Sequence, residues 1–440
     1  MKKSDLSKLM SFGFEQTFTI EQWWSDEGFT ATSDTPLKRE KMLALAQAIA
    51  KELDGEYIES EDIWKHMQYE TFDKDGNPSF VVTMDPGSIE VKTPPRLLDG
   101  LIEMATPLFK AAEVAGLVPY RNWWYGVKGA TEGGCHVNMG GLSDETNPLI
   151  MRPDLAVKYA AYVHNRPWVH YPFMGPDTGP EGNAMRMDEK PGLDKVKDAF
   201  EKYKDAQNKA NLTADEIHDL FKDTNLIAEK ASYPSLFKLK NPLYLIEDRA
   251  QESLRGAEEF YHVSEMRIKI FEQLLDQDAP EDLKKFDDLH GECLTSFWLW
   301  ENFQVWANQI DLNPENFQCF FDRQFPVIEF GQTPQNISLK EGRRPRVVKD
   351  IQKRGNTVVS KTIDTSYKRV ELFFDGPGEL NVKASGIEFL SPPMKSGNKF
   401  YKYLDIKVDK EAPELDISLY NSDKKIKETA KFNLNDMKWV

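Results

Sequence analysis

"FGFEQTFTI", residues 12–20, alternates apolar and polar side chains along most of its length. Phe14, Gln16 and Phe18 fall on one face of an extended chain, and Glu15 and Thr17 fall on the other. Successive side chains of a strand point to opposite faces of its sheet, so this period of two predicts a β-strand with one buried face. The same alternation places a carboxylate, that of Glu15, on the polar face of the strand.

Further strand and helix patterns follow without a regular strand–helix–strand rhythm. Strands are predicted over residues 66–72, 79–93, 133–141 and 241–253, and helices over residues 35–55, 96–116, 152–165, 212–221 and 257–309. Pro107 predicts a kink or break in the second of these helices, and Thr213 with Glu216 forms a capping pattern. The irregular mixture favours an α+β fold with a largely antiparallel sheet.

The composition of the chain changes near residue 325. Beyond it, short alternating segments such as "ELNVKASGIEFLS" and "YKYLDIKVD" are punctuated by Gly, Pro and Asn, and helical periodicity is nearly absent. We therefore expect a main α+β domain over residues 1–325 and a small, β-rich, sandwich-like accessory domain over residues 326–440.

Bulk composition argues against several classes of protein. The 440 residues carry a formal charge of -16, which disfavours nucleic-acid binding because phosphate contacts need a basic face. No apolar run is long enough to span a bilayer, and the N-terminus lacks the continuous apolar core of a secretory signal. The three cysteines are widely spaced and form no CxxC. We expect a cytoplasmic protein with free thiols that binds neither nucleic acid nor membranes.

Polar residues inside the strand patterns are the candidates for chemistry. The Walker A, dinucleotide-binding and HExxH motifs are absent from the sequence. The strand patterns instead carry Glu15, Glu70, Glu90, His136, Asn138, Glu247 and Arg249. Burial of such groups is unfavourable unless they are paired or bind a metal, and carboxylates with an imidazole suit Mg²⁺ or Mn²⁺.

Arginines complete this pattern because their guanidinium groups hold anionic oxygens in a two-pronged geometry. The candidates are Arg152, Arg166, Arg186 and Arg249. Carboxylates, a divalent cation and arginines together indicate phosphoryl transfer from a nucleotide, in which positioning and charge neutralisation supply most of the catalysis.

Longer motifs resemble a known family. "TMDPGSIEVKTPP" (83–95), "ATEGGCHVNMGGLSDETNPLIMRPDLAVKYAAYVHNRPWVHYPFMGP" (130–176) and "MRMDE" (185–189) are similar, in order and spacing, to the amidoligase family often joined to transglutaminase-like domains. That family belongs to the glutamine synthetase and glutamate-cysteine ligase superfamily. The resemblance is strong over residues 83–189 and weaker at "IEDRAQES", and "FGFEQTF" resembles the opening strand of the superfamily.

The resemblance implies an ATP-dependent carboxylate–amine ligase that uses Mg²⁺ or Mn²⁺. Its fold would be a glutamine-synthetase-like antiparallel sheet with a concave active-site face and helices outside. A carboxylate of an amino acid, peptide or protein side chain would form an acyl phosphate, and an amine would then displace phosphate to give an amide.

The resemblance also implies roles for individual residues. It assigns Glu15 and Glu90 to metal binding, His136 to metal or phosphate binding, Arg152 and Arg249 to phosphate or carboxylate binding, and Glu247 to the site as a third carboxylate. With the polar residues of the strand patterns, the candidate metal ligands are Glu15, Glu90, His136 and Glu70, where Glu70 or Glu21 would replace the carboxylate missing at Thr17. The candidates for cofactor binding are His136, Asn138 and Arg249, and those for catalysis are Arg152, Arg186, Arg249 and Glu247. Two positions depart from the family pattern. Thr17 stands where the opening strand would carry a second glutamate, and Asn138 stands where many relatives have a histidine or an apolar residue.

Two alternatives stay open from the sequence. One is an ATP-dependent phosphotransferase or a glutamate-cysteine-ligase-like enzyme that acts on a small amino acid. The other is a degenerate ligase fold that binds a peptide or scaffolds a partner without catalysis, which the loss of a carboxylate at Thr17 suggests.

Overall fold

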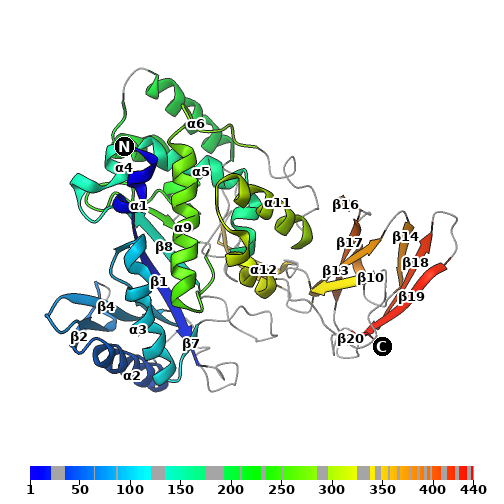
Figure 1. The fold of residues 1–440 in the computed structure, drawn as a ribbon, viewed down its shortest axis with the longest axis horizontal. Coiled ribbons are helices and arrows are strands. Elements are labelled where there is room, and N and C mark those ends of the chain that lie inside the picture. The colour runs from blue at the N-terminus through cyan, green and yellow to red at the C-terminus, as the bar shows by residue number, and fades with distance from the viewer. Residues whose placement is uncertain are drawn as a thin grey trace. The chain divides into compact units, whose positions relative to one another are not determined.

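A computed structural model gives the fold of most of the chain (Figure 1). It describes residues 1–20, 35–63, 65–85, 88–119, 134–173, 193–208, 211–228, 234–249, 251–284 and 296–324, and then the strands between residues 337 and 439. The chain divides into two compact units, Met1–Lys285 with Gln309–Leu312, and Phe286–Asn308 with Asn313–Val440. The domain boundary expected at residue 325 stays a prediction.

A nine-stranded antiparallel sheet organises the first unit, as the mixed pattern predicts. Its strands are β1 (Ser11–Thr19), β2 (Glu56–Glu61), β3 (Met67–Phe72), β4 (Pro78–Asp85), β5 (Ser88–Lys92), β6 (Arg96–Leu97), β7 (Val118–Pro119), β8 (Cys135–Gly140) and β9 (Ile246–Asp248). The order across the sheet is β2-β3-β4-β5-β1-β8-β9, and β6 and β7 also pair with β1. Strand β1 therefore lies inside the sheet, between β5 and β8.

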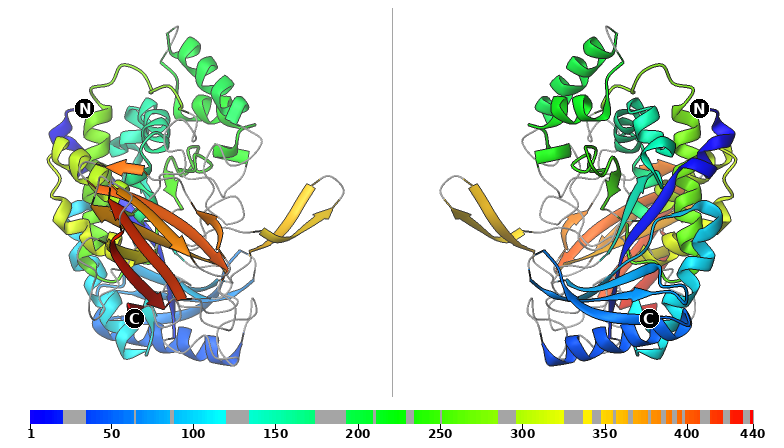
Figure 2. Two further views of the ribbon diagram at one scale, coloured as in Figure 1. Left: turned by 90° about the vertical axis from the view of Figure 1, so that its right-hand side faces the viewer. Right: turned by 90° about the vertical axis from the view of Figure 1, so that its left-hand side faces the viewer.

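The apolar face of the sheet packs against helices. Phe14 and Phe18 of β1 are at most 1% exposed. The ring centroid of Phe14 lies 4.2 Å from that of Phe260, and the ring centroid of Phe18 lies 6.0 Å from that of Phe109. These two partners belong to α9 (Ala257–Leu274) and α3 (Leu101–Val114), which lie against the same side of the sheet (Figure 2). The predicted alternation is thus confirmed, since Glu15 and Thr17 occupy the opposite face and Gln16 is buried on the face of Phe14 and Phe18.

The first unit has seven further α-helices among its described residues. They are α1 (Leu6–Leu9), α2 (Pro36–Glu52), α4 (Pro148–Met151), α5 (Asp154–His164), α6 (Leu193–Gln207), α7 (Ala214–Phe221) and α8 (Asn225–Ala228). Helix α7 begins with the predicted capping box between Thr213 and Glu216. Helix α3 runs through Pro107 without the predicted break, since the buried stripe that includes Leu101, Met104 and Leu108 holds both halves against their neighbours.

Three expected elements differ from the structure. Residues 79–93 form two strands rather than one, because Asp85 of β4 pairs with Ser88 of β5 and the chain reverses between them. The long helical stretch is not continuous, since α9 ends at Leu274 and the next described helix begins at Ser296. Strand β9 covers only the middle of residues 241–253, and β2 carries no strong alternation that would have predicted it.

The second unit contains helices α11 (Ser296–Gln309, whose last residue falls in the first unit) and α12 (Gln318–Gln324), followed by strands. Those strands are β10 (Ile337–Glu341), β11 (Val348–Arg354), β12 (Thr357–Ile363), β13 (Tyr367–Asp375), β14 (Gly378–Lys383), β15 (Ile387–Leu390), β16 (Met394–Ser396), β17 (Lys399–Lys407), β18 (Glu414–Asn421), β19 (Ile426–Asn433) and β20 (Lys438–Trp439). They form sheets of five, two and four strands. Among the described residues, no helix has the length and hydropathy needed to cross a bilayer.

Candidate functional site

The strand register brings polar residues from three neighbouring strands to one place. Glu15 of β1 lies opposite His136 of β8, and Asn138 of β8 lies opposite Glu247 of β9. Directly opposed residues of antiparallel strands point to the same face, and so do residues two apart, which adds Arg249. This face is the one turned away from α3 and α9. The sequence placed each of these residues on a polar strand face, and the register explains why they meet.

The side chains form a group that we call the carboxylate–histidine cluster. Its members are Glu15, His136, Asn138, Lys238, Glu247 and Arg249. His136 Nδ1 lies 2.8 Å from Glu15 Oε2 and 3.6 Å from Glu247 Oε1. The amide of Asn138 donates to Glu15 Oε1 at 3.3 Å. Glu247 is 2% exposed, so its carboxylate depends on these neighbours rather than on water.

Two permanent cations neutralise the two carboxylates. Lys238 Nζ donates to Glu247 Oε1 at 3.0 Å and to Glu15 Oε1 at 3.4 Å. Arg249 Nη1 donates to Glu247 Oε1 at 3.1 Å. Because charges of opposite sign interact strongly where water is largely excluded, these contacts offset the unfavourable burial of both carboxylates.

The pKa values of the cluster reflect this pairing. Burial alone would raise the pKa of Glu15, but the hydrogen bond with His136 and the charges of His136 and Lys238 hold that pKa well below its usual range. Burial likewise opposes protonation of His136, yet the hydrogen bond to Glu15 raises the pKa of the imidazole. The pKa of Lys238 is also raised, because Glu15 and Glu247 outweigh its burial. The cluster therefore favours ionised side chains.

The donor set of the cluster fits a divalent cation. One ligand atom each from Glu15, His136 and Glu247 can be chosen so that all lie within 4.8 Å of one another. Octahedral ligands about 2.1 Å from Mg²⁺ are roughly 3 Å apart when adjacent and roughly 4 Å apart when opposite. The imidazole-to-carboxylate separations of 2.8 and 3.6 Å fall near that range. The two carboxylates are the donors that Mg²⁺ and Mn²⁺ sites use, and the imidazole nitrogen is a donor typical of transition metals.

Two predicted metal ligands lie outside this group. Glu90 of β5 shares the face but lies opposite Thr17, one diagonal step from Glu15, or about 7 to 8 Å between Cα atoms. Its Oε1 lies 3.6 Å from Lys92 Nζ. Glu70 lies three strands from Glu15 in register, or about 14 Å at ordinary strand spacing. Ser60 Oγ donates to Glu70 at 2.6 Å, so this carboxylate has its own local partner.

The hydroxyl group of Thr17 makes several buried hydrogen bonds. Its Oγ1 lies 2.7 Å from the carbonyl oxygen of Gly134 and 2.6 Å from Ser253 Oγ, and it accepts from the amide of Gly134 at 2.8 Å. The side chain is 3% exposed. A glutamate at this position would need room that Ser253 and Gly134 occupy, so packing favours a small hydroxyl side chain here.

The predicted arginines go to different places. Arg249 belongs to the cluster. Arg166 forms two 2.8 Å hydrogen bonds with Glu281, and its guanidinium lies over the ring of Tyr162. That arrangement ties the end of α5 to the segment after α9. Arg186 lies outside the described residues.

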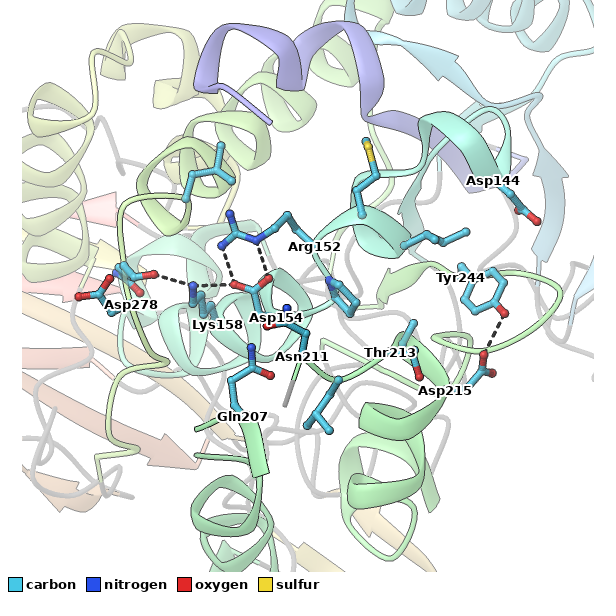
Figure 3. Close-up of a pocket in the computed structure, with 17 residues that line it drawn as sticks. Asp144, Arg152, Asp154, Lys158, Gln207, Asn211, Thr213, Asp215, Tyr244 and Asp278 are labelled. Carbon is cyan, nitrogen blue, oxygen red and sulfur yellow. Dashed lines mark hydrogen bonds and ion pairs between the residues drawn. The ribbon is translucent and has the colours of Figure 1, made fainter. Parts of the chain in front are cut away.

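Arg152 lines a separate cleft of about 850 Å³ (Figure 3). Arg152 Nε and Nη2 each donate to Asp154 at 2.8 Å, and Lys158 Nζ donates to the same carboxylate at 2.7 Å. Across the cleft, Tyr244 donates its hydroxyl hydrogen to Asp215 at 2.9 Å. The cleft is lined largely by polar residues. One of its lining residues, Tyr244, precedes β9 in the sequence and lies three residues before Glu247.

Lys238 is the member of the cluster that sequence reasoning missed. It lies in "SLFKLK", residues 235–240, beside β9, because Ser235 and Glu247 exchange two backbone hydrogen bonds of 2.7 and 3.1 Å. The available signal was a lysine between apolar residues in a short alternating run, the same signal that singled out Glu90.

Comparison with protein families gives one match. Residues 68–223 match the family described as "Putative amidoligase enzyme (DUF2126)". The matched segment, which is less than half of the chain, contains Glu90, His136, Asn138 and Arg152, and it begins after Glu15 and ends before Lys238. A search of curated proteins finds no match.

Proposed function

We propose that this chain is an ATP-dependent carboxylate–amine ligase that uses Mg²⁺ or Mn²⁺ at the carboxylate–histidine cluster. The observation that carries the proposal is the convergence of Glu15, His136 and Glu247 within 4.8 Å on one face of the sheet. The strand that supplies His136 lies within the segment that matches an amidoligase family. This match favours amide formation over other uses of a metal and a nucleotide.

The proposed ligation has two steps, formation of an acyl phosphate and its displacement by an amine. A substrate carboxylate oxygen attacks the γ-phosphorus of ATP, the bond to the β-phosphate oxygen breaks, and ADP leaves. An amine nitrogen then attacks the acyl carbon, phosphate leaves, and the nitrogen loses a proton to give the amide. A bound divalent cation would neutralise phosphate charge during the transfer.

The residues of the cluster have separate tasks in this scheme. Glu15, His136 and Glu247 would hold the cation. Arg249 is a candidate for an anionic substrate oxygen because its charge is permanent and only 17% of its side chain is exposed. Asn138 orients Glu15 through its 3.3 Å hydrogen bond, which gives this departure from the family pattern a positioning role.

Amine-dependent ADP release tests the proposal. With Mg²⁺ or Mn²⁺ and mixed amino acids or peptides as acceptors, we expect Glu247→Gln and His136→Asn to lower the rate about 10²- to 10³-fold. Glu70→Gln is the matched control, since this glutamate lies on the same sheet three strands away. Equal loss in Glu70→Gln and Glu247→Gln, or no amine-dependent release in the wild type, would contradict the proposal. Free glutamate as a sufficient acceptor or donor would favour the small-amino-acid ligase.

A binding protein without catalysis is the second candidate. The observation that favours it is the self-neutralisation of the cluster, in which Lys238 and Arg249 already pair with Glu247. This candidate predicts no thermal shift with ATP and Mg²⁺ or Mn²⁺, whereas the ligase predicts an upward shift because ligands that bind the native state stabilise it.

A further inference from the structure

Lys238 contacts three oxygen atoms of the cluster at once. Its Nζ lies 3.1 Å from Asn138 Oδ1, 3.0 Å from Glu247 Oε1 and 3.4 Å from Glu15 Oε1. Two of these atoms belong to the carboxylates that converge with His136. The ammonium group therefore lies where a divalent cation shared by Glu15 and Glu247 would be held.

The charge balance makes joint occupancy unfavourable. Glu15 and Glu247 carry two negative charges, and Lys238 and Arg249 carry two positive charges, so the cluster with neutral His136 is formally neutral. A divalent cation added to this group would leave a charge of +2 where water is largely excluded. Removal of the ammonium from contact with the carboxylates lowers that excess and frees their oxygen atoms for the metal.

The structure allows such removal without backbone rearrangement. Backbone hydrogen bonds hold the segment, with Leu245 N donating to Lys238 O at 3.1 Å and Ser235 exchanging two bonds with Glu247. The side chain of Lys238 is 24% exposed, so part of it already contacts solvent. Lysine carries its ammonium on a flexible four-carbon stem. Rotation about the bonds of this stem is sufficient to move the charge away from the two carboxylates.

We propose that Lys238 is an internal counter-cation that occupies the divalent-cation position of the carboxylate–histidine cluster and is displaced when the metal binds. The lysine stabilises the two carboxylates in the metal-free protein and weakens metal affinity, so it tunes the metal concentration at which the site fills. This inference rests on the cation site of the proposed function, but it does not require that the protein form amides.

Direct measurement of Mn²⁺ binding, by electron paramagnetic resonance or calorimetry on the full chain, tests the inference. We expect Lys238→Met to bind Mn²⁺ about ten- to a hundredfold more tightly than wild type, because a positive charge a few ångström from the ion is lost. Lys238→Gln keeps a hydrogen-bond donor and serves if the methionine variant folds poorly. Lys240→Met is the matched control, since Lys240 is exposed two residues away and its ammonium lies over the ring of Phe237.

Thermal unfolding without metal supplies a second readout. Lys238→Met should unfold at a lower temperature than wild type in a chelator, because two carboxylates lose a partner, and Mn²⁺ should restore more stability to the variant than to wild type. A merely structural lysine would lower stability without tighter Mn²⁺ binding. Addition of His136→Asn to the variant should abolish the gain in affinity, which places the bound ion at the cluster.

The outcomes separate this inference from the proposed function. Equal Mn²⁺ affinity in wild type and Lys238→Met overturns the role of Lys238 and leaves the metal site intact. Absence of Mn²⁺ binding in both proteins overturns this inference and the metal part of the proposed function together. Tighter binding in the variant, with no amine-dependent ADP release from wild type, supports Lys238 as the counter-cation and contradicts the ligase.

Discussion

His136 is the residue whose protonation sets the charge of the cluster at neutral pH. Its folded-state pKa is raised above 6.5, so the protonated imidazole contributes stability that is fully present below 6.5 and is lost as the pH rises through the folded value. Glu15 behaves in the opposite way. Its folded-state pKa lies far below 4.5, so its contribution is present above 4.5 and is lost only in strong acid. Between pH 4.5 and pH 6.5, the protonated imidazole of His136 and the ionised carboxylate of Glu15 both stabilise the folded protein.

This reasoning gives a pH-dependent prediction for His136→Asn. The free energy of unfolding of wild type should exceed that of the variant most at about pH 5.5, and the difference should shrink toward about pH 9 as the imidazole loses its proton. Urea unfolding in metal-free buffer at a series of pH values measures it. A difference that grows with pH would mean that burial, rather than the Glu15 hydrogen bond, dominates the pKa of His136.

Thr17 supports a second residue-scale prediction. Thr17→Val keeps the shape of the side chain but leaves the amide of Gly134 without its hydrogen-bond acceptor, and Ser253 Oγ keeps only its hydrogen bond to the carbonyl oxygen of Gly134. We expect a loss of about 1 to 3 kcal/mol in the free energy of unfolding, with unchanged Mn²⁺ affinity. Urea unfolding and Mn²⁺ titration on the same samples provide the two readings. Weaker Mn²⁺ binding at wild-type stability would instead place Thr17 in the cation site.

At the scale of elements, strand β9 is fixed from both faces of the sheet. Glu247 and Arg249 face the cluster, and Asp248 faces α9, where Arg267 Nη2 donates to it at 2.7 Å. Arg267 is 3% exposed, so its charge depends on this partner. Removal of one member of a buried ion pair leaves the other charge uncompensated. The Asp248–Arg267 pair on one face of the sheet therefore stabilises β9, and the cluster lies on the other face.

Asp248→Asn should lower the free energy of unfolding by about 3 to 5 kcal/mol, as expected for a broken buried pair. Glu201→Gln is the control, because the side chain of Glu201 is 71% exposed in its pair with Lys204, and such exposed pairs contribute about 0 to 1 kcal/mol. Denaturant unfolding of both variants makes the comparison. Similar small losses in both would show that Arg267 finds another partner and that β9 does not depend on Asp248.

Sequence periodicity predicted the faces of the strands better than their extents. The alternation of β1 and β8 placed Glu15 and His136 on polar faces, and the register brought them together. The break between β4 and β5 was missed because an apolar run on both sides of a turn has the same period as one strand. Glu70 was grouped with the cluster because the sequence specifies its face but not how many strands separate it from Glu15. Lys238 was missed because long side chains reach a site from outside the strands that define it.

At the scale of the whole molecule, every residue of the cluster belongs to the first compact unit, Met1–Lys285 with Gln309–Leu312. The members come from points far apart in the sequence, residues 15, 136–138, 238 and 247–249, and the sheet joins them. Every member of the cluster lies before residue 250 in the sequence. The cation site should therefore be a property of the first part of the chain.

A chain that ends at residue 324 should bind Mn²⁺ with the affinity of the full chain. This end point preserves the aromatic packing of α11 on the segment that follows it, where Trp300 lies 4.6 Å from Phe321 and Phe303 lies 5.3 Å from Phe317 between ring centroids. A chain that ends at residue 312 removes Phe317 and Phe321, and it should aggregate because it exposes the apolar face of α11. Size-exclusion chromatography followed by Mn²⁺ titration compares the two truncations with the full chain. Loss of Mn²⁺ binding in a monomeric, folded chain of residues 1–324 would assign the C-terminal strands a part in the site.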